Sequence, residues 1–343
     1  MSTMLALRRR SFMQAVTGLA LLPATARARV CATPPSSDKI GQAVTEAQKR
    51  YAGLTDGKNA DYIPYLAGIP SNLFGVAASA PDGTVKEAGD AAYALAIESI
   101  AKVFTLALVL QESGPQIVQG KLGANATGLP FNSVMAVELN HGKPVSPLVN
   151  AGAMATVSLV KASSPEERWN KIIGIMSKFA GRPLTVNDEV YKSESETNEH
   201  NRGIALLLKS YGYMYSDPLE ACDLYTRECS IAVTTHDLAM MAGTLSNGGI
   251  NPVTKEKVIE ASFVPRVLSE MAMEGLYDTT GDWMYTVGLP AKTGVGGGLI
   301  AVAPGALGIA AFSPPLDAAG NSVRAQKATQ YIAEALGLNI YAS

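Results

Sequence analysis

A serine and a lysine three residues apart are the first side chains in this chain whose types and spacing suggest chemistry. Ser99 and Lys102 lie at the start of a segment with helical periodicity. Side chains three positions apart on a helix share one face and can meet. A serine hydroxyl is a weak nucleophile until a base removes its proton, and a lysine can be that base when burial lowers its pKa. The spacing therefore indicates a nucleophile, Ser99, activated by Lys102.

The same spacing occurs at residues 36–39 and 158–161, so the motif is weak evidence by itself. Ser36 follows two prolines in a hinge, and Ser158 ends a helical segment with no strand before it. Ser99 instead follows a predicted hairpin and opens a buried helix, where free amides and the helix dipole favour a developing oxyanion. The context therefore favours Ser99.

A second signal is Lys292-Thr293-Gly294, which runs into Val295 and three further glycines, Gly296–Gly298. Glycines allow a backbone to approach a ligand closely. Together, an early serine-x-x-lysine and a late lysine-threonine-glycine resemble the serine acyl-enzymes of the penicillin-recognising architecture. The middle motif of that group, Ser-x-Asn or Tyr-x-Asn, is absent from the sequence. A β-lactamase or a peptidoglycan peptidase is therefore disfavoured.

Composition limits the remaining classes. The chain has 343 residues, 47% of them hydrophobic and 17% charged, which is enough apolar material for a large core. Lys and Arg (28) nearly balance Asp and Glu (30), for a formal charge of -2 without a basic block, which argues against nucleic-acid binding. No run of 18 apolar residues predicts a membrane span. The three cysteines, Cys31, Cys222 and Cys229, form no CxxC pair, so neither a disulfide framework nor a cysteine zinc site is expected.

The elements that must position these motifs alternate between strand and helix patterns. Strands are expected at 73–80, near 84–87, and at 285–290, 299–303 and 307–313. Helices are expected at 38–52, 99–111, 151–160, 165–179, 201–210, 218–228, 235–245 and 321–336, with no convincing strand between about 116 and 275. We predict an α+β fold, a β-lactamase/DD-peptidase-like antiparallel sheet flanked by helices. The catalytic domain would span 38–343, with sheet halves at about 60–98 and 284–343 and a helical region at about 99–283.

The first 28 residues are predicted to be a cleaved export signal. Three arginines, Arg8–Arg10, precede a short apolar stretch at 15–22 and small residues at positions 24, 26 and 28. Residues 9–14 resemble the twin-arginine consensus, so a periplasmic or secreted location is expected. A linker at 29–37 would follow. The alternative is a protein of the cytoplasm with a basic tail, and we do not expect Cys31 to carry a lipid anchor.

Between about Tyr62 and Leu338 the chain resembles one family, the serine-dependent glutaminases, which share this architecture but lack its middle motif. The resemblance is carried by ordered segments at compatible spacing: 62–66, 74–77, 98–106, 150–153, 193–194, 201–202, 228–231, 246–249, 275–278 and 288–298. One departure is Glu98, since the family often has Gln before the nucleophile. An inward-pointing carboxylate there would raise the pKa of Lys102.

The resemblance implies hydrolysis of L-glutamine to L-glutamate and ammonia through a γ-glutamyl ester on Ser99, with Lys102 as the proton carrier. It implies that Tyr62 and Tyr277 lie beside the serine and relay protons, and that Tyr277 also contacts the substrate. Substrate-binding roles are implied for Asn150, Glu194, Asn201 and Tyr225, and an oxyanion hole for the amides of Ser99 and Val295. It implies no metal or organic cofactor, and self-association into dimers or tetramers.

The residue types are compatible with that set. A free amino acid presents an α-ammonium, which needs an acid such as Glu194, and an α-carboxylate, which needs amide or hydroxyl donors. Taken singly, each residue has a plain structural explanation: Glu194 on a solvated turn, Asn201 as a helix cap and Tyr225 as a core aromatic. Only the whole set favours binding.

Other signals are discounted. His141, His200 and His236 form no metal-binding pattern, although Glu138 and His141 at helical spacing are a weak candidate. The glycines at 296–298 fit a dinucleotide pattern but lead into a strand, which rejects a nicotinamide site. Two rival functions stay open: an acylase acting on another γ-glutamyl amide or on asparagine, and a catalytically silent amino-acid receptor.

Overall fold

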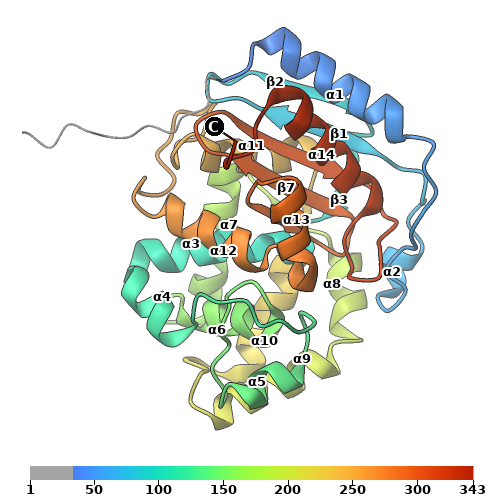
Figure 1. Ribbon diagram of the computed structural model, residues 1–343. Coiled ribbons are helices and arrows are strands. Elements are labelled where there is room, and N and C mark those ends of the chain that lie inside the picture. Colours follow the sequence, from blue (N-terminus) through green and yellow to red (C-terminus); the bar gives the residue numbers. More distant parts are fainter. Residues whose placement is uncertain (1–33, 343) are drawn as a thin grey trace, which may run out of the picture. The chain divides into compact units, whose positions relative to one another are not determined.

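A computed structural model describes residues 34–342 of the chain (Figure 1). The expected export signal and Cys31 lie outside the described residues. The fold consists of one antiparallel sheet with helices on both of its faces and a helical region joined to it. This is the α+β, β-lactamase-like arrangement that the sequence predicts.

The main sheet joins the two ends of the described chain. Its strands are β1 (Gly75–Ser79), β2 (Val85–Gly89), β6 (Ala291–Thr293), β7 (Gly298–Ala303) and β8 (Leu307–Phe312), in the order β2-β1-β8-β7-β6. All neighbouring pairs are antiparallel, and β1 pairs with β8 so that Ala77 lies opposite Ala310. The hairpin of β1 and β2 and the later strands therefore form one sheet although about 200 residues separate them in sequence.

Helices cover both faces of this sheet. Helices α1 (Ser37–Tyr51) and α14 (Val323–Leu336) pack side by side on one face, seen in blue and dark red in Figure 1. Helix α11 (Thr235–Ser246) packs on the other. Alternate residues of β1 follow this division: Val76 and Ala78 belong to the core cluster under α1 and α14, whereas Ala77 belongs to the cluster with α11. Two-sided burial explains why these strands are apolar throughout.

The helical region lies between β2 and β6 and was expected from its 3.6-residue periodicity. The predicted helices are confirmed with small changes at their ends: α3 (Ala101–Ser113), α6 (Asn150–Leu159), α7 (Pro165–Ala180), α9 (Glu199–Ser210), α10 (Pro218–Cys229) and α11. The described chain also contains helices that were not predicted: α2 (Pro64–Ala67), α4 (Pro115–Lys121), α5 (Val134–Leu139), α8 (Asp188–Ser195), α12 (Val264–Glu274) and α13 (Thr280–Thr286).

Two expectations about strands are wrong. A second sheet of three short strands, β3 (Leu95–Ala96), β5 (Ile231–Val233) and β4 (Thr185–Val186), places two strands where none was expected. Strands of two or three residues are too short for an alternating pattern to be visible.

The expected strand at 285–290 is also wrong, because α13 extends to Thr286 and the strand begins only at Ala291. Trp283 in α13 is buried and donates from Nε1 to the carbonyl of Leu289 at 2.8 Å, while Tyr285 is 90% exposed. Gly288 then adopts a positive φ of 67°, which turns the chain into β6.

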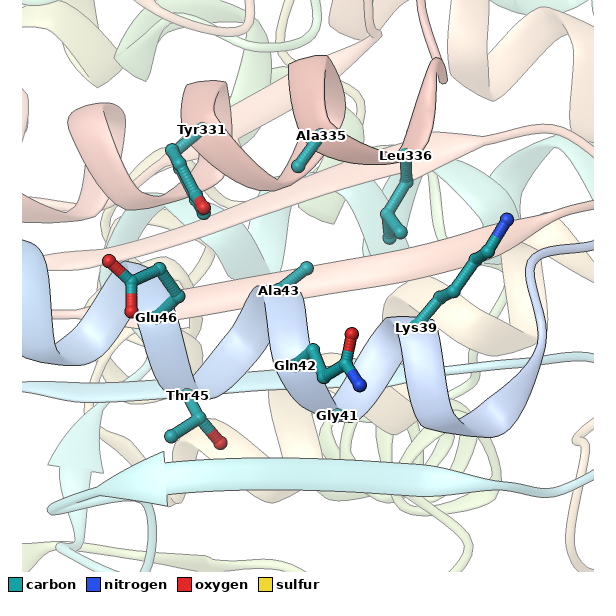
Figure 2. A pocket seen from close by; sticks show the side chains of 9 residues that line it. All are labelled: Lys39, Gly41, Gln42, Ala43, Thr45, Glu46, Tyr331, Ala335 and Leu336. Atoms are coloured by element: carbon teal, nitrogen blue, oxygen red, sulfur yellow. The ribbon is translucent and has the colours of Figure 1, made fainter.

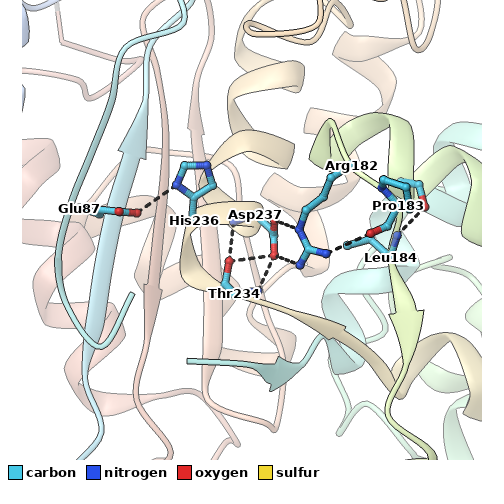
Figure 3. Close-up of polar contacts among 8 residues, drawn as sticks. Glu87, Arg182, Pro183, Leu184, Thr234, His236 and Asp237 are labelled. Carbon is cyan, nitrogen blue, oxygen red and sulfur yellow. Dashed lines mark hydrogen bonds and ion pairs between the residues drawn. The ribbon is translucent and has the colours of Figure 1, made fainter. Parts of the chain in front are cut away.

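The small sheet and the start of α11 fix the chain segment that precedes Ser99. The amide of Ile97 donates to the carbonyl of Ile231 at 2.9 Å. Figure 3 shows how the next helix begins: Thr234 and Asp237 form a reciprocal capping box, and Arg182 donates to both oxygens of Asp237 at 2.7 and 2.6 Å. These contacts hold β5, and through it the backbone that leads to the nucleophile. In the described part of the chain, no helix has the length and apolar character needed to cross a membrane.

Candidate active site

Ser99 and Lys102 lie together at the start of the first helix of the helical region. Ser99 is in a 3₁₀ turn, η1 (Glu98–Ile100), that continues into α3, and Lys102 is in the first turn of α3. Lys102 Nζ is 2.6 Å from Ser99 Oγ, and the two residues are only 1% and 5% exposed. Burial lowers the pKa of Lys102 from 10.5 to about 8, against the opposing effect of nearby thiol and carboxyl groups. A buried amine in this position can accept the proton of a serine hydroxyl.

The turn that holds Ser99 depends on glycines from the lysine-threonine-glycine segment. Glu98 adopts a left-handed φ of 52°, which is uncommon for a residue other than glycine. A Cβ added at Gly294 would lie 2.9 Å from the carbonyl oxygen of Ile97, and one at Gly296 would lie 2.9 Å from that of Ala96. Only glycine permits this close approach of two backbones. The segment that contains Val295 is therefore held beside the amide of Ser99.

A network of hydrogen-bonded polar side chains extends from Lys102, with Asn150 at its centre. Asn150 Oδ1 accepts hydrogen bonds from Lys102 Nζ at 2.8 Å and from Tyr225 OH at 3.0 Å. Asn150 Nδ2 donates to Asn201 Oδ1 at 3.0 Å. Asn150 begins α6, Asn201 lies in the first turn of α9 and Tyr225 lies on α10, so three helices supply this network. The predicted substrate-binding residues are thus brought together next to Ser99.

Glu194 from α8 completes the acidic side of the site. One oxygen of Glu194, one of Glu98 and the Sγ of Cys229 all lie within 4.8 Å of one another. Burial raises the pKa of Glu194 well above its usual value, and the neighbouring Glu98 carboxyl raises it further. The acid expected at the ammonium position is therefore present, together with a second carboxyl that was noted in the sequence only as a departure.

Two tyrosines, Tyr62 and Tyr277, lie near these acids. Tyr277, held at a φ of 58°, is buried, and its ring lies 4.5 Å from that of Phe131. Burial raises the pKa of Tyr277, and the nearby Ser99 hydroxyl acts in the other direction. Tyr62 is 54% exposed, and desolvation together with the charges of Tyr277 and Glu98 raises its pKa. Tyr62 and Phe131 also line a cavity of about 480 Å³, which brings a solvent-accessible space to the edge of the site.

Two buried charged residues, Glu228 and Lys292, contact parts of the site although neither was predicted as a site residue. Glu228 Oε2 accepts from Thr105 Oγ1 at 2.5 Å, and its charge raises the pKa of Lys102. Lys292 Nζ donates to the carbonyls of Gly275 at 3.1 Å and Thr293 at 2.9 Å, and it lies 4.2 Å from the ring centroid of Tyr277. Lys292 therefore holds the segment around Tyr277. In the sequence, Glu228 was noted only as part of the matching segment 228–231, with no role assigned to it.

The alternative serine-lysine pairs lie elsewhere. Ser158 Oγ donates to the carbonyl of Ala155, and Lys161 Nζ donates to the carbonyl of Glu112, so each side chain is used structurally. Ser36 is the N-cap residue of α1. The context of a hairpin and a buried helix therefore pointed to the pair whose hydroxyl and amine are in contact.

Two of the histidines, His200 and His236, contact groups outside the network around Ser99. His200 lies 2.7 Å from the carbonyl oxygen of Asn132, and His236 lies 3.0 Å from Glu87 (Figure 3). Glu138, the weak metal candidate beside His141, accepts from Tyr211 OH at 2.7 Å. A groove of about 740 Å³ between α1 and α14 contains none of the predicted site residues (Figure 2).

The fold and the site define a class of protein, the β-lactamase-like serine enzymes, in which a serine and a lysine start a buried helix beside a glycine-rich strand. The model of the family described as Glutaminase matches residues 57–341. The chain belongs to the glutaminase family.

Individual relatives support this assignment. The chain is 58% identical over 309 residues to a glutaminase of Mycobacterium ulcerans (strain Agy99), covering 90% of this chain and 97% of the relative. It is 55% identical to glutaminase 1 of Escherichia coli (strain K12), covering 89% and 98%. A solved structure of a probable glutaminase is similar at a TM-score of 0.89 and 54% identity, covering 90% of this chain and all of that one. A Bacillus glutaminase is similar at a TM-score of 0.79 and 28% identity, covering 89% and 99%.

Proposed function

We propose that this chain hydrolyses the side-chain amide of L-glutamine to L-glutamate and ammonia through a γ-glutamyl ester on Ser99. The observation that carries the proposal is the 2.6 Å contact between Ser99 Oγ and the Nζ of a buried lysine, Lys102, with a pKa of about 8. Membership of the glutaminase family supplies the substrate.

The first half-reaction forms the ester. Neutral Lys102 takes the proton of Ser99 Oγ as the oxygen bonds to the carboxamide carbon. The amides of Ser99 and Val295 stabilise the oxyanion of the tetrahedral intermediate. When the carbon–nitrogen bond breaks, the proton passes to the leaving amine, with Tyr62 and Tyr277 as relays, and ammonia departs.

The second half-reaction releases glutamate. A water molecule gives a proton to Lys102 and attacks the ester carbonyl, and the Ser99 oxygen recovers a proton when it leaves. Throughout, Glu194 binds the α-ammonium of the substrate, while Asn150, Asn201 and Tyr225 bind its α-carboxylate. Every step uses groups of this chain, water and the substrate.

Ammonia release from L-glutamine and from L-asparagine, measured side by side, tests this function. We expect kcat/KM to be higher for glutamine, and a preference for asparagine would favour an acylase of another amide. The Ser99→Ala protein should release no ammonia. A parent protein that binds glutamine but releases no ammonia would favour an amino-acid receptor instead.

We further propose that the protein is exported to the bacterial cell envelope through its twin-arginine-like leader and that it self-associates. The leader carries Arg9 and Arg10 ahead of a mildly apolar stretch. Cell fractionation tests the location, and light scattering on a sizing column tests for a dimer or tetramer.

A further inference from the structure

Two carboxyl groups, those of Glu98 and Glu194, meet in the buried interior beside Ser99. Glu98 directly precedes the nucleophile and is 3% exposed, and Glu194 reaches it from α8. Their oxygens belong to the group of atoms that lie within 4.8 Å of one another. Among the described residues, none of the ion pairs includes either carboxyl. The pair therefore has no built-in countercharge in direct contact.

The same pocket contains polar atoms without partners. The Oε1 atoms of Glu98 and Glu194 and the hydroxyl of Tyr277 are buried, and none has a hydrogen-bond partner in the part of the chain that the structure describes. Buried polar atoms are nearly always satisfied in folded proteins, so carboxyl oxygens without a donor indicate either a proton held between the two acids or a ligand that brings donors. An ammonium group supplies three donors and one positive charge.

Two carboxylates this close in a buried site cannot both be ionised at low cost. Burial raises the pKa of both Glu98 and Glu194, and the charge of Glu98 adds to the effect on Glu194. The stable arrangement is one proton held between the two groups, as in other carboxyl dyads. A dyad of this kind titrates as a unit.

We propose that Glu98 is a specificity-determining residue that shares one proton with Glu194, so that the pair presents a single negative charge to the α-ammonium of a free amino acid. This inference rests on the proposed function and names the regulation of the same site. Once the shared proton is lost, a second negative charge stands next to Ser99. That charge opposes the developing oxyanion. Activity should therefore fall on the alkaline side because of Glu98.

The other titratable groups around the pair come from several elements, and most of them stay neutral. Burial raises the pKa values of the tyrosines and of the cysteine. The groups are Lys102, Tyr62, Tyr225, Glu228, Cys229 and Tyr277. Lys292 lies behind Tyr277, with its pKa lowered by burial and by Lys102. Glu228, whose pKa burial raises to about 8, is therefore the carboxyl whose effect must be separated from that of Glu98.

The pH dependence of kcat/KM for glutamine in Glu98→Gln tests the proposal, because glutamine at this position resembles the protonated acid. We expect the midpoint of the alkaline limb to move upward by at least about half a pH unit. Glu228→Gln is the matched control, a buried carboxyl on the other side of Lys102, and it should leave the alkaline limb in place. Coincident alkaline limbs in Glu98→Gln and the parent would overturn the proposal, as would an equal upward shift in Glu228→Gln.

The shared proton can also be detected without turnover. At pH 8, the infrared carbonyl band of protonated carboxyl groups should lose the same intensity in Glu98→Gln, in Glu194→Gln and in the double variant. A loss twice as large in the double variant would show two separate protons and overturn the sharing. A parent protein that releases no ammonia from glutamine at any pH would instead overturn the proposed function, while the infrared result decides the shared proton by itself.

Discussion

Replacing Lys102 by methionine separates the chemical role of the buried amine from its structural role. Methionine has nearly the same length and no charge, so it fills the space without a proton carrier. At pH 7 a group with a pKa of about 8 is neutral in about one molecule in ten, whereas at 10.5 it would be neutral in about one in three thousand. Burial thus raises the fraction of usable base by a factor of about 300.

The expected loss of turnover follows from this role. Without Lys102 neither the attack of Ser99 nor the protonation of the leaving amine has a general base or acid, and such groups contribute about 10²- to 10⁴-fold. We therefore expect kcat for glutamine to fall at least about a hundredfold in Lys102→Met, as measured by coupled ammonia release. Lys102→Ala should lose at least as much.

The stability of the same variant is the control. The folded protein holds Lys102 at a pKa below its ordinary value, so stability is gained as pH rises from about 8 to 10.5, and below pH 8 the buried charge costs about 3 kcal/mol. Methionine removes that cost together with the hydrogen bonds to Ser99 and Asn150, which contribute in the opposite sense. Urea unfolding at pH 6.5 should show an unfolding free energy no lower than the parent's. Turnover within tenfold of the parent's, in a folded variant, would refute the assigned role of Lys102.

Four further predictions follow from individual residues. Glu194→Gln should raise KM for glutamine at least about tenfold, because it removes the charge that pairs with the α-ammonium. Glu228→Gln should move the acid limb of kcat/KM to lower pH, because the Glu228 charge raises the pKa of Lys102. Burial raises the pKa of Glu270 from 4.5 to about 8, so the folded parent loses stability as pH rises through that range. Glu270→Gln should therefore match the parent in unfolding free energy near pH 4 and exceed it by up to a few kcal/mol at pH 9. Equal unfolding curves at pH 9 would contradict this. Replacing Arg9 and Arg10 by lysine should leave the protein inside fractionated cells, and an unaltered distribution would contradict the twin-arginine interpretation.

Sequence reasoning singled out Ser99 because local signals agreed there. A hairpin, a buried helix start and a serine-lysine spacing coincide only at Ser99, and the structure brings Lys102 to it. The helices were predictable from their long amphipathic periodicity. The two-residue strands β3 and β4 were not, because so short a segment shows no alternation.

The contacts between segments that are distant in sequence could not be predicted from the sequence either. Nothing near Glu98 in sequence indicates that Glu194, almost a hundred residues away, lies against it, since that contact depends on how α8 packs in the helical region. The family resemblance supplied the list of site residues, but the departure at Glu98 gained a physical meaning only from the fold. The same holds for Glu228 and its contact with Thr105.

The proposed mechanism requires that Ser99 carries the γ-glutamyl group as an ester during the reaction. Mass spectrometry of a trapped adduct tests this most directly. A glutamine analogue that forms a stable ester would be incubated with the parent protein, which is then digested and mapped. We predict a single modified peptide that carries the γ-acyl mass on Ser99 and that is missing from Ser99→Ala. A label on another side chain, or a labelled Ser99→Ala protein that continues to release ammonia from glutamine, would contradict the account.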